Sequence, residues 1–579
     1  MKLHNSTRVL FIFGFWIGWI NTLAANQPDQ ALIEFESIIS PEVANAGMVV
    51  TQESRATDIG VEILSQGGNA VDAAVAVGFA LAVTLPRAGN IGGGGFMLIY
   101  DSKQRKVDAL DYREMAPLRA TRDMFLNKNS QADNKKSRYS TLSAGVPGTV
   151  AGLVAAHKKY GRLPFKQLVA PAIKLANSLP MSFAMAQSLN MKHDRLSSDV
   201  ESRKIFIKSD GSNWKLGDSI RQQDLAKTLT RIADSNGKDF YQGKIAQQIA
   251  NYFAANDGII TTKDLANYHV VWRQPVTTQL DDMQIFSMPP PSSGGIHLIQ
   301  LLNIVRHFPL AQYGMNSANE VHVKAEALKY AYADRSKYLG DPDFVNVPVN
   351  RLTSEKYAKL IAQKISLQKV TPSVQIKPGQ YFDQESPQTT HFSIIDKDGN
   401  IVSNTYTLNF SFGSGKTIAN TGILLNNQMD DFSAKPGSPN GYGLIGGNAN
   451  AIEAGKRPLS SMTPVIVTKN NKPWLVTGSP GGSRIISTVF NFLLNRIIHQ
   501  KNIAEATIAP RLHHQWFPDK LQLESGFSID TIERLKQKGL PVSIRNPWGS
   551  LQSIEYDGKY FYGFSDTRRP GALAKGLNQ

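Results

Sequence analysis

Apolar residues recur at helical spacing through much of the first half of the chain. The pattern predicts an amphipathic helix over 55–66, ended by a Gly-Gly pair, and a buried Ala- and Val-rich helix over 72–85, ended by Pro86. From 145 to 340 the pattern remains mostly helical. It is broken by the proline- and glycine-rich segment 289–295, which predicts a rigid turn followed by a flexible one.

Strand patterns appear in two places. Four consecutive glycines lead into a predicted strand over 96–100, and a second strand is expected over 107–112. After residue 388 the pattern changes to β-hairpins, and the first pairs 391–395 with 401–408 around an Asp398-Gly399 turn. Further hairpins are predicted within 465–477 and 553–562, with a long apolar helix over 483–498 between them.

Two segments lack any periodicity. Residues 127–140 are polar and predict an exposed loop, and residues 366–388 predict a linker or an exposed processing loop. Helices combined with antiparallel hairpins indicate an α+β fold built in layers.

The N-terminus has the organisation of a secretory signal. Lys2 and Arg8 precede an apolar run over 9–20, and small residues follow up to Ala25. The alternative is a membrane anchor, but a bilayer span needs about 20 apolar residues and this run is shorter. We therefore expect residues 1–25 to be a cleaved signal peptide, with the mature protein periplasmic or secreted and without a membrane anchor.

Composition excludes several kinds of chemistry. The 579-residue chain contains no cysteine, so it has no thiol nucleophile, no disulfide and no cysteine-ligated metal. Its net charge of +16 comes from lysines and arginines scattered along the chain without a dense basic tract. That distribution does not favour nucleic-acid binding, and it is consistent with a mild attraction for anionic small molecules.

The first hairpin brings candidate catalytic groups together. With a two-residue turn at Asp398-Gly399, the extended register sets Thr389 opposite position 408, beside Thr407 and Asn409. A threonine, a second hydroxyl and an amide thus meet at a strand end next to a linker. Threonine pairs across strands often only stabilise a sheet, so this geometry alone does not establish catalysis.

Two loops add candidate binding groups. Residues 477–483 (TGSPGGS) join a strand to a helix, and glycines there expose backbone N–H groups and the positive end of the helix dipole. Such a turn suits an oxyanion hole, although an ordinary strand–helix connection has the same composition. Residues 426–431 (NNQMDD) combine amides with adjacent carboxylates, which either bind a cation or form a solvated loop.

These motifs together resemble those of the γ-glutamyltranspeptidases. The resemblance covers residues from about 45 to 570 in order, and no catalytic position departs from the family pattern. The matching segments are 388–393 (QTTHFS), 422–432 (GILLNNQMDDF), 457–462 (RPLSSM), 478–484 (GSPGGSR), 89–97 (GNIGGGGFM), 111–114 (DYRE) and 145–148 (GVPG).

The resemblance implies an N-terminal-nucleophile hydrolase fold, a four-layer αββα sandwich with two stacked antiparallel sheets. It also implies a precursor that cuts itself between Gln388 and Thr389, giving a large subunit, 26–388, and a small catalytic subunit, 389–579, that remain together as a heterodimer. Cleavage would free the α-amine of Thr389, which could then take the proton from the threonine hydroxyl.

Family roles carry over onto individual residues. Thr389 is the expected nucleophile, Thr407 orients it, and the N–H groups of Gly481 and Gly482 hold the oxyanion. Two charged clamps are expected for the free amino-acid end of a γ-glutamyl group. Its α-carboxylate would be bound by Arg113, Ser460 and Ser461, and its α-ammonium by Asn409, Gln428 and Asp431.

The implied activity is transfer of the γ-glutamyl group of glutathione and related amides to water or to amino-acid and peptide acceptors. We expect no cofactor and no metal. Residues 436–447 resemble the family's lid loop, with Tyr442 as the covering aromatic, although any Gly- and Pro-rich surface loop looks alike. Gly413–Thr417 resembles part of a phosphate loop, but Phe410 stands where that motif requires a glycine.

Two other readings stay open at this level. An acylase of the same fold acting on a glutaryl group would also use Arg113 and the two serines, whereas Asp431 and Gln428 favour an acyl group that carries an ammonium. A catalytically inactive homologue with a binding role is the second alternative, and the intact Thr389 and Gly481-Gly482 argue against it.

Overall fold

The computed structural model describes residues 37, 39–377 and 389–578. The chain divides into two units, residues 1–40 and residues 41–579, and the second contains both large sheets and their helices. The predicted signal peptide and Gln388 lie outside the described residues.

Two seven-stranded sheets form the centre of the fold, and all neighbouring strands in them are antiparallel. Sheet I has the order β1 (Glu42–Ala44), β20 (Phe561–Ser565), β19 (Gln552–Tyr556), β15 (Lys472–Thr477), β14 (Val465–Lys469), β9 (Met283–Ser287) and β8 (Val276–Leu280). Sheet II has the order β21 (Leu573–Gly576), β2 (Gly47–Thr51), β10 (Thr390–Asp396), β11 (Ile401–Thr407), β3 (Gly94–Asp101), β4 (Lys106–Tyr112) and β7 (Val271–Arg273).

The two sheets face each other through β10 and β11. Ser393 Oγ donates a hydrogen bond to the carbonyl of Gln552 in β19 (2.9 Å), and Ser403 Oγ donates to the carbonyl of Thr477 in β15 (3.1 Å). Alternate residues of β10, Phe392 and Ile394, pack instead in the hydrophobic cluster with the helices on the other face. Side chains with the parity of Ser393 therefore point between the sheets, because strand side chains alternate.

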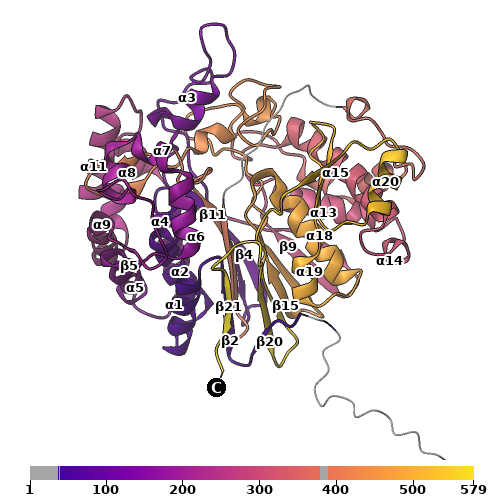
Figure 1. The fold of residues 1–579 in the computed structure, drawn as a ribbon, viewed down its shortest axis with the longest axis horizontal. Coiled ribbons are helices and arrows are strands. Elements are labelled where there is room, and N and C mark those ends of the chain that lie inside the picture. Colours follow the sequence, from indigo (N-terminus) through magenta and orange to yellow (C-terminus); the bar gives the residue numbers. More distant parts are fainter. Residues whose placement is uncertain (1–36, 38, 378–388, 579) are drawn as a thin grey trace, which may run out of the picture. The chain divides into compact units, whose positions relative to one another are not determined.

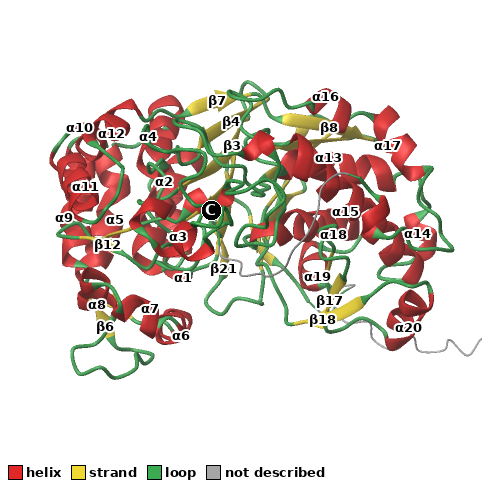
Figure 2. Cartoon of the chain, turned by 90° about the horizontal axis from the view of Figure 1, so that it is seen from above, coloured by secondary structure: helices red, strands yellow, loops and turns green. Residues whose placement is uncertain are grey.

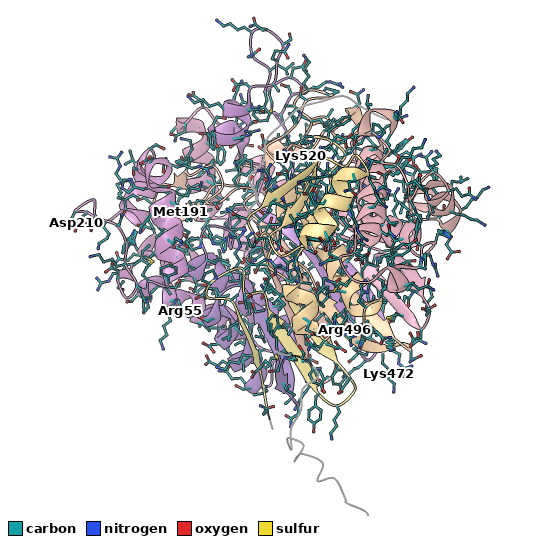
Figure 3. The ribbon with its side chains drawn as sticks, turned by 45° about the vertical axis from the view of Figure 1, so that its right-hand side comes forward. Arg55, Met191, Asp210, Lys472, Arg496 and Lys520 are labelled. Atoms are coloured by element: carbon teal, nitrogen blue, oxygen red, sulfur yellow. The ribbon has the colours of Figure 1, made fainter. Side chains whose placement is uncertain are left out.

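Helical layers cover the outer faces of both sheets (Figures 1 and 2). Sheet II is covered by α1 (Ser54–Ser65), α2 (Ala70–Thr84), α4 (Thr149–Tyr160) and α5 (Phe165–Asn177), and sheet I by α13 (Gly294–Val305), α15 (Ala318–Tyr338) and α18 (Ile485–Ile497). Arg496 of α18 ties its layer to sheet I through an ion pair with Glu555 of β19 (Figure 3). The predicted four-layer αββα sandwich is confirmed.

The remaining elements connect or flank these layers. The helices are α3 (Asn134–Tyr139), α6 (Phe183–Met191), α7 (His193–Ser197), α8 (Val200–Phe206), α9 (Gln223–Asp234), α10 (Lys238–Gln242), α11 (Lys244–Ala255), α12 (Thr262–Asn267), α14 (Leu310–Tyr313), α16 (Val349–Leu352), α17 (Glu355–Ala362), α19 (Ile503–Ile508) and α20 (Ile529–Gln537). The small strands are β5 (Leu179–Pro180), β6 (Ser219–Ile220), β12 (Thr417–Ile418), β13 (Ile423–Leu424), β16 (Leu512–His513), β17 (Leu521–Glu524) and β18 (Val542–Arg545).

Helix α2 shows why the first predicted pair of helices forms where it does. The Asn69 side chain accepts hydrogen bonds from backbone N–H groups of the first turn, and the Asp72 carboxylate accepts one from the Asn69 backbone N–H. Together these bonds form a capping box. Every residue of the helix is buried, and it ends at Thr84, just before Pro86 would interrupt it. Its Ala and Val content therefore reflects burial on all sides.

The register of the β10–β11 hairpin corrects the sequence prediction by one residue. Thr390 pairs with Tyr406, so Thr389 comes opposite Thr407 and not opposite position 408. The reason is the turn: Asp396 N–H donates to the Asn400 carbonyl, which leaves three residues in the loop, and Gly399 takes a positive φ of 81°. A three-residue loop with a left-handed glycine replaces the expected two-residue turn.

Other predictions need smaller corrections. The stretch 145–340 also contributes β7, β8 and β9, which are too short to interrupt a helical pattern visibly. The predicted loop 127–140 contains α3, and the third hairpin has a longer connection because Tyr556 pairs with Phe561. Within the predicted linker, the described part is fastened: Thr371 N–H donates to Glu326 and its carbonyl accepts from Lys329 Nζ (2.6 Å).

Candidate active site

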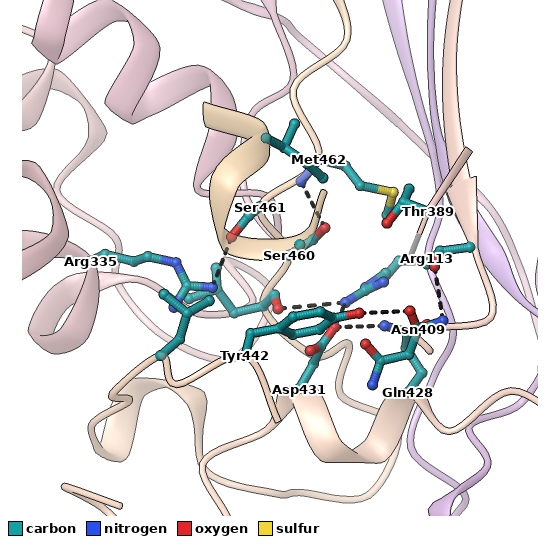
Figure 4. A pocket seen from close by; sticks show the side chains of 15 residues that line it. Arg113, Arg335, Thr389, Asn409, Gln428, Asp431, Tyr442, Ser460, Ser461 and Met462 are labelled. Atoms are coloured by element: carbon teal, nitrogen blue, oxygen red, sulfur yellow. Dashed lines mark hydrogen bonds and ion pairs between the residues drawn. The ribbon is translucent and has the colours of Figure 1, made fainter. Parts of the chain in front are cut away.

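A small cavity lies at the start of β10, where Thr389 directly precedes the strand (Figure 4). Thr389 has the strand parity of Ser393, so its side chain belongs to the space between the sheets. The cavity brings together residues from eight separate stretches of sequence. Its lining consists of Arg113, Arg335, Thr389, Thr407, Asn409, Gln428, Asp431, Tyr442, Leu444, Leu459, Ser460, Ser461, Met462, Gly482 and Ile485.

Thr407 and Asn409 form the wall next to Thr389. Thr407 ends β11, and its Oγ1 accepts a hydrogen bond from the Asn409 backbone N–H (2.8 Å). Asn409 has a positive φ of 77°, and its Nδ2 donates to the carbonyl of Asn427 (2.9 Å). That bond fixes the amide so that Asn409 Oδ1 is the free end, and this buried oxygen has no hydrogen-bond partner in the described part of the chain.

Asp431 supplies the carboxylate of the cavity. Its Oδ2 accepts hydrogen bonds from Arg113 Nη2 (2.5 Å) and Gln428 Nε2 (2.6 Å), while its Oδ1 lies 3.4 Å from Asn440 Nδ2. Burial raises the pKa of Asp431, and the positive charge of Arg113 opposes that rise. The Oε1 atom of Gln428 is also buried without a partner among the described residues.

Arg113 follows β4 directly and is only 1% exposed. Its Nε donates to the carbonyl of Pro458 (3.1 Å), and its Nη1 lies 3.5 Å from Glu114 Oε2. Burial raises the pKa of Glu114 to about 7, with Arg113 partly offsetting the rise. Arg113 therefore stands between two buried carboxyl groups, of which only Asp431 lines the cavity.

Ser460 and Ser461 line the cavity, and hydrogen bonds from Ser293 hold their segment in place. The backbone N–H and the Oγ of Ser293 both donate to the Ser460 carbonyl (2.8 and 2.7 Å). Ser460 Oγ accepts from the Met462 backbone N–H (3.1 Å). These bonds anchor the segment to the start of α13.

The glycine turn adopts a conformation that only glycine takes easily. Gly481 and Gly482 have φ values of 142° and 56°, and the chain passes from them through a short 3-10 turn into α18. A Cβ on Gly482 would come within 2.5 Å of the Tyr442 ring. The turn thus brings backbone N–H groups close to the cavity at a helix start.

Tyr442, the predicted lid residue, lines the cavity. It is 6% exposed, and its hydroxyl donates to the Asn409 carbonyl (2.6 Å) while its ring packs on Phe410 at a centroid distance of 5.3 Å. The Gly441 backbone N–H donates to Asp430 Oδ2 (2.8 Å), which fastens the loop beside Asp431. Of residues 436–447, Tyr442 and Leu444 line the cavity.

Most of the residues predicted from the sequence line this one cavity, and Gly481 adjoins it through Gly482. Sequence reasoning missed Arg335, whose helix carries no motif, and Asn440, which appeared only as part of the lid segment. Only knowledge of the face that α15 turns to the cavity could have identified Arg335. Among the described residues no group of histidine, aspartate or glutamate side chains could hold a metal ion. None of the helices described there is both long and apolar enough to cross a membrane.

Stacked antiparallel sheets between helical layers, with a threonine at the start of a central strand, define the architecture of N-terminal-nucleophile hydrolases. Among solved structures, the chain is similar to a cephalosporin acylase from Bacillus halodurans at 28% identity and a TM-score of 0.84, covering 96% of this chain and 99% of that one. It is also similar to γ-glutamyltranspeptidase from Helicobacter pylori at 47% identity and a TM-score of 0.56, over 60% of this chain and 99% of that one.

Sequence comparison assigns the family. The γ-glutamyltranspeptidase family model matches residues 56–576. The chain is 53% identical to the glutathione hydrolase proenzyme of Escherichia coli (strain K12), with 93% of each chain covered, and 38% identical to that of Bacillus subtilis (strain 168), with 96% and 95% covered. The chain belongs to the γ-glutamyltranspeptidase family.

Proposed function

We propose that this enzyme is a self-cleaving γ-glutamyltransferase and glutathione hydrolase that acts through an acyl-enzyme on Thr389. The observation that carries the proposal is a set of three acceptors with unused capacity beside the nucleophile. Asn409 Oδ1 and Gln428 Oε1 are buried without partners in the described structure, and the Asp431 carboxylate adjoins them. An α-ammonium, which donates three hydrogen bonds, meets the needs of all three.

The negatively charged α-carboxylate of the substrate also has a proposed binding group, Arg113. Arg113 and Asp431 pair with each other (2.5 Å). A γ-glutamyl group carries both an α-carboxylate and an α-ammonium, so it can replace this pair with two new ones, the carboxylate on Arg113 and the ammonium on Asp431. The guanidinium is suited to the task because its planar donor groups match a carboxylate, and Ser460 and Ser461 add hydroxyl donors.

Thr389 serves twice in the proposed mechanism. In the precursor its hydroxyl attacks the preceding Gln388 carbonyl, which exchanges the peptide bond for an ester and frees the α-amine. Water then hydrolyses the ester, leaving a carboxylate on Gln388 and the hydroxyl on Thr389. An α-amine has a pKa of about 8, so the neutral amine can take the proton of the hydroxyl as Thr389 attacks the γ-carbonyl. Thr407 orients the threonine, and the N–H groups of Gly481 and Gly482 stabilise the developing oxyanion.

The acyl-enzyme is then released to water or to the amine of an amino acid or peptide. We propose that the large fragment, 26–388, and the small fragment, 389–579, stay together as a heterodimer. The sheet pairing supports this, because β10 and β11 of the small fragment lie between β2 and β3 of the large one. The active-site cavity also takes Arg113 from one fragment and Thr389 from the other.

Comparing two chromogenic donors tests the proposed substrate. We expect purified enzyme to release p-nitroaniline from γ-glutamyl-p-nitroanilide with a kcat/KM at least about tenfold above that for glutaryl-p-nitroanilide, because only the former presents an ammonium to Asp431. A preference for the glutaryl compound would instead assign the enzyme to the acylase alternative that the Bacillus halodurans structure represents.

Export through a cleaved signal peptide is the proposed route to the periplasm or medium, and it rests on the sequence of residues 1–25. N-terminal sequencing of protein made in a Gram-negative host should find a start near Ala25 or Asn26. Retention of Met1 on membrane-bound protein would contradict this expectation.

The lid makes a further prediction. Tyr442→Ala removes the ring over Gly482 and the bond to the Asn409 carbonyl, so water and acceptors should reach the acyl-enzyme differently. We expect the ratio of transfer to hydrolysis to change at least about threefold, while the acylation rate changes less. Measuring both products over a range of acceptor concentrations checks this, and Tyr442→Phe, which keeps the ring, is the matched control. An unchanged ratio would reject a lid role.

A further inference from the structure

Arg335 is a buried cation at the active-site cavity. It lies in the last turn of α15, is 4% exposed, and lines the cavity together with Thr389 and Ser461 (Figure 4). Its Nε donates to Ser293 Oγ (3.0 Å) and its Nη2 to Ser461 Oγ (3.3 Å). The large fragment thereby contributes a second guanidinium to the site beside Arg113.

The direction of these hydrogen bonds constrains the serine hydroxyls. A guanidinium can only donate, so Ser461 Oγ must accept from Arg335, and its own proton remains available to an acceptor elsewhere. Ser293 Oγ donates its proton to the Ser460 carbonyl and accepts from Arg335 in the same way. Arg335 therefore orients the Ser461 hydroxyl so that it can donate a hydrogen bond at the cavity wall.

The charge of Arg335 has no carboxylate of its own to balance it. Among the described residues Arg335 forms no ion pair. The carboxylate of Asp431 attracts it electrostatically, but that carboxylate is paired with Arg113. Burial lowers the pKa of Arg335 to about 10, which leaves the side chain positively charged at neutral pH. A buried guanidinium next to a cavity is stabilised when an anion enters that cavity.

The helix that carries Arg335 is attached to a second segment next to the cavity. One turn earlier in α15, Tyr332 donates its hydroxyl proton to the Ser483 carbonyl, directly after the Gly481-Gly482 turn. The same helix face thus contacts both the glycine turn and Ser461, which belong to the small fragment. These two contacts hold this face of α15 against the cavity segments of the small fragment.

We propose that Arg335 is a positioning residue for substrate selection, which holds Ser461 as a hydrogen-bond donor and adds a second positive charge where the α-carboxylate of the γ-glutamyl group binds. This inference rests on the proposed function and deepens it. Arg113 binds the carboxylate directly, whereas Arg335 acts through the Ser461 hydroxyl and through its charge.

The test compares two donors that differ only at the α-carboxylate: γ-glutamyl-p-nitroanilide and its α-carboxamide. Arg335→Gln should lower kcat/KM for the acid about tenfold, mainly through KM, and should change kcat/KM for the carboxamide less than about twofold. Arg335→Lys, which keeps the charge but not the paired donors, should give an intermediate loss for the acid. If Arg335→Gln lowered kcat/KM equally for both donors, Arg335 would have a structural role only, and the proposal would be overturned. An unchanged kcat/KM for the acid would overturn it as well.

Controls separate positioning from folding. Lys337→Gln removes a charge from an exposed site on the same helix and should leave the preference for the acid unchanged. Arg335→Gln combined with Ser461→Ala should lose less than the sum of the single losses, because Arg335 acts through that hydroxyl. Fragment formation and melting curves show whether each variant folds, and if Arg335→Gln does not, Arg335→Lys carries the same two-donor comparison. Wild-type enzyme inactive on both donors would refute the proposed function, a result distinct from failure of this inference.

Discussion

Thr389→Ala is expected to abolish self-cleavage and activity together. The substitution removes the hydroxyl that attacks the Gln388 carbonyl during maturation and the substrate carbonyl afterwards, so purified protein should remain a single chain. Wild-type protein should give fragments of roughly 40 and 21 kDa, obtained by scaling the 63.6 kDa chain mass by residue number. Turnover of γ-glutamyl-p-nitroanilide should fall at least about 10³-fold, as expected when a nucleophile is removed.

Two neighbouring substitutions sharpen this result. Thr389→Ser keeps the hydroxyl and loses only the methyl group that restricts its rotamer, so cleavage should continue at a reduced rate. Thr390→Ala is the matched control: Thr390 has the strand parity of Phe392 and faces the helical layer, so cleavage should persist. Cleavage of Thr389→Ala at the same bond would mean that an external protease does the cutting, and wild-type turnover would place the nucleophile elsewhere.

The sequence predicted the layers of the fold well because their patterns are long. The buried helix α2 and the hairpin around Asn470-Asn471 have unambiguous periodicity and turn residues, and both formed close to where they were expected. Short strands such as β8 were missed because five residues between helices leave no distinct period. The hairpin register was displaced by one residue because the two-residue turn predicts that Lys397 pairs with Asn400, whereas Asp396 pairs with it around a three-residue turn.

The candidate site was predictable for a different reason. Thr389 and Thr407 follow from one hairpin, but Arg113 and Asp431 are 318 residues apart, and no local pattern relates them. Their assignment came from resemblance to a family. Arg335 shows the limit: its contacts with Ser293 and Ser461 depend on how α15 rotates against two loops, which periodicity does not specify. Nor did the sequence reveal that Arg113 and Asp431 form an ion pair with each other.

That pairing gives Asp431→Asn the second large expected effect. The variant should still cut itself, because Asp431 is hydrogen-bonded to Arg113 and Gln428 and has no part in the attack of Thr389 on Gln388, but it should lose γ-glutamyl activity. The substrate ammonium would face a neutral amide, and removing one partner of a buried pair costs about 3–5 kcal/mol, or roughly two to four orders of magnitude in kcat/KM. Steady-state kinetics with γ-glutamyl-p-nitroanilide measure the loss.

A donor without the ammonium separates recognition from damage to the site. Glutaryl-p-nitroanilide has no ammonium to pair with Asp431, so Asp431→Asn should turn it over with a kcat/KM no lower than that of wild type. The ratio of kcat/KM for the γ-glutamyl donor to that for the glutaryl donor should therefore fall sharply. Asp430→Asn is the matched control, because the Asp430 carboxylate contacts Ser137 and the Gly441 N–H and does not line the cavity, so its variant should keep the wild-type ratio. If Asp431→Asn kept a near-normal kcat/KM for the γ-glutamyl donor, the ammonium would have to be bound by Asn409 and Gln428 alone, and the assignment of Asp431 as its counter-charge would be wrong.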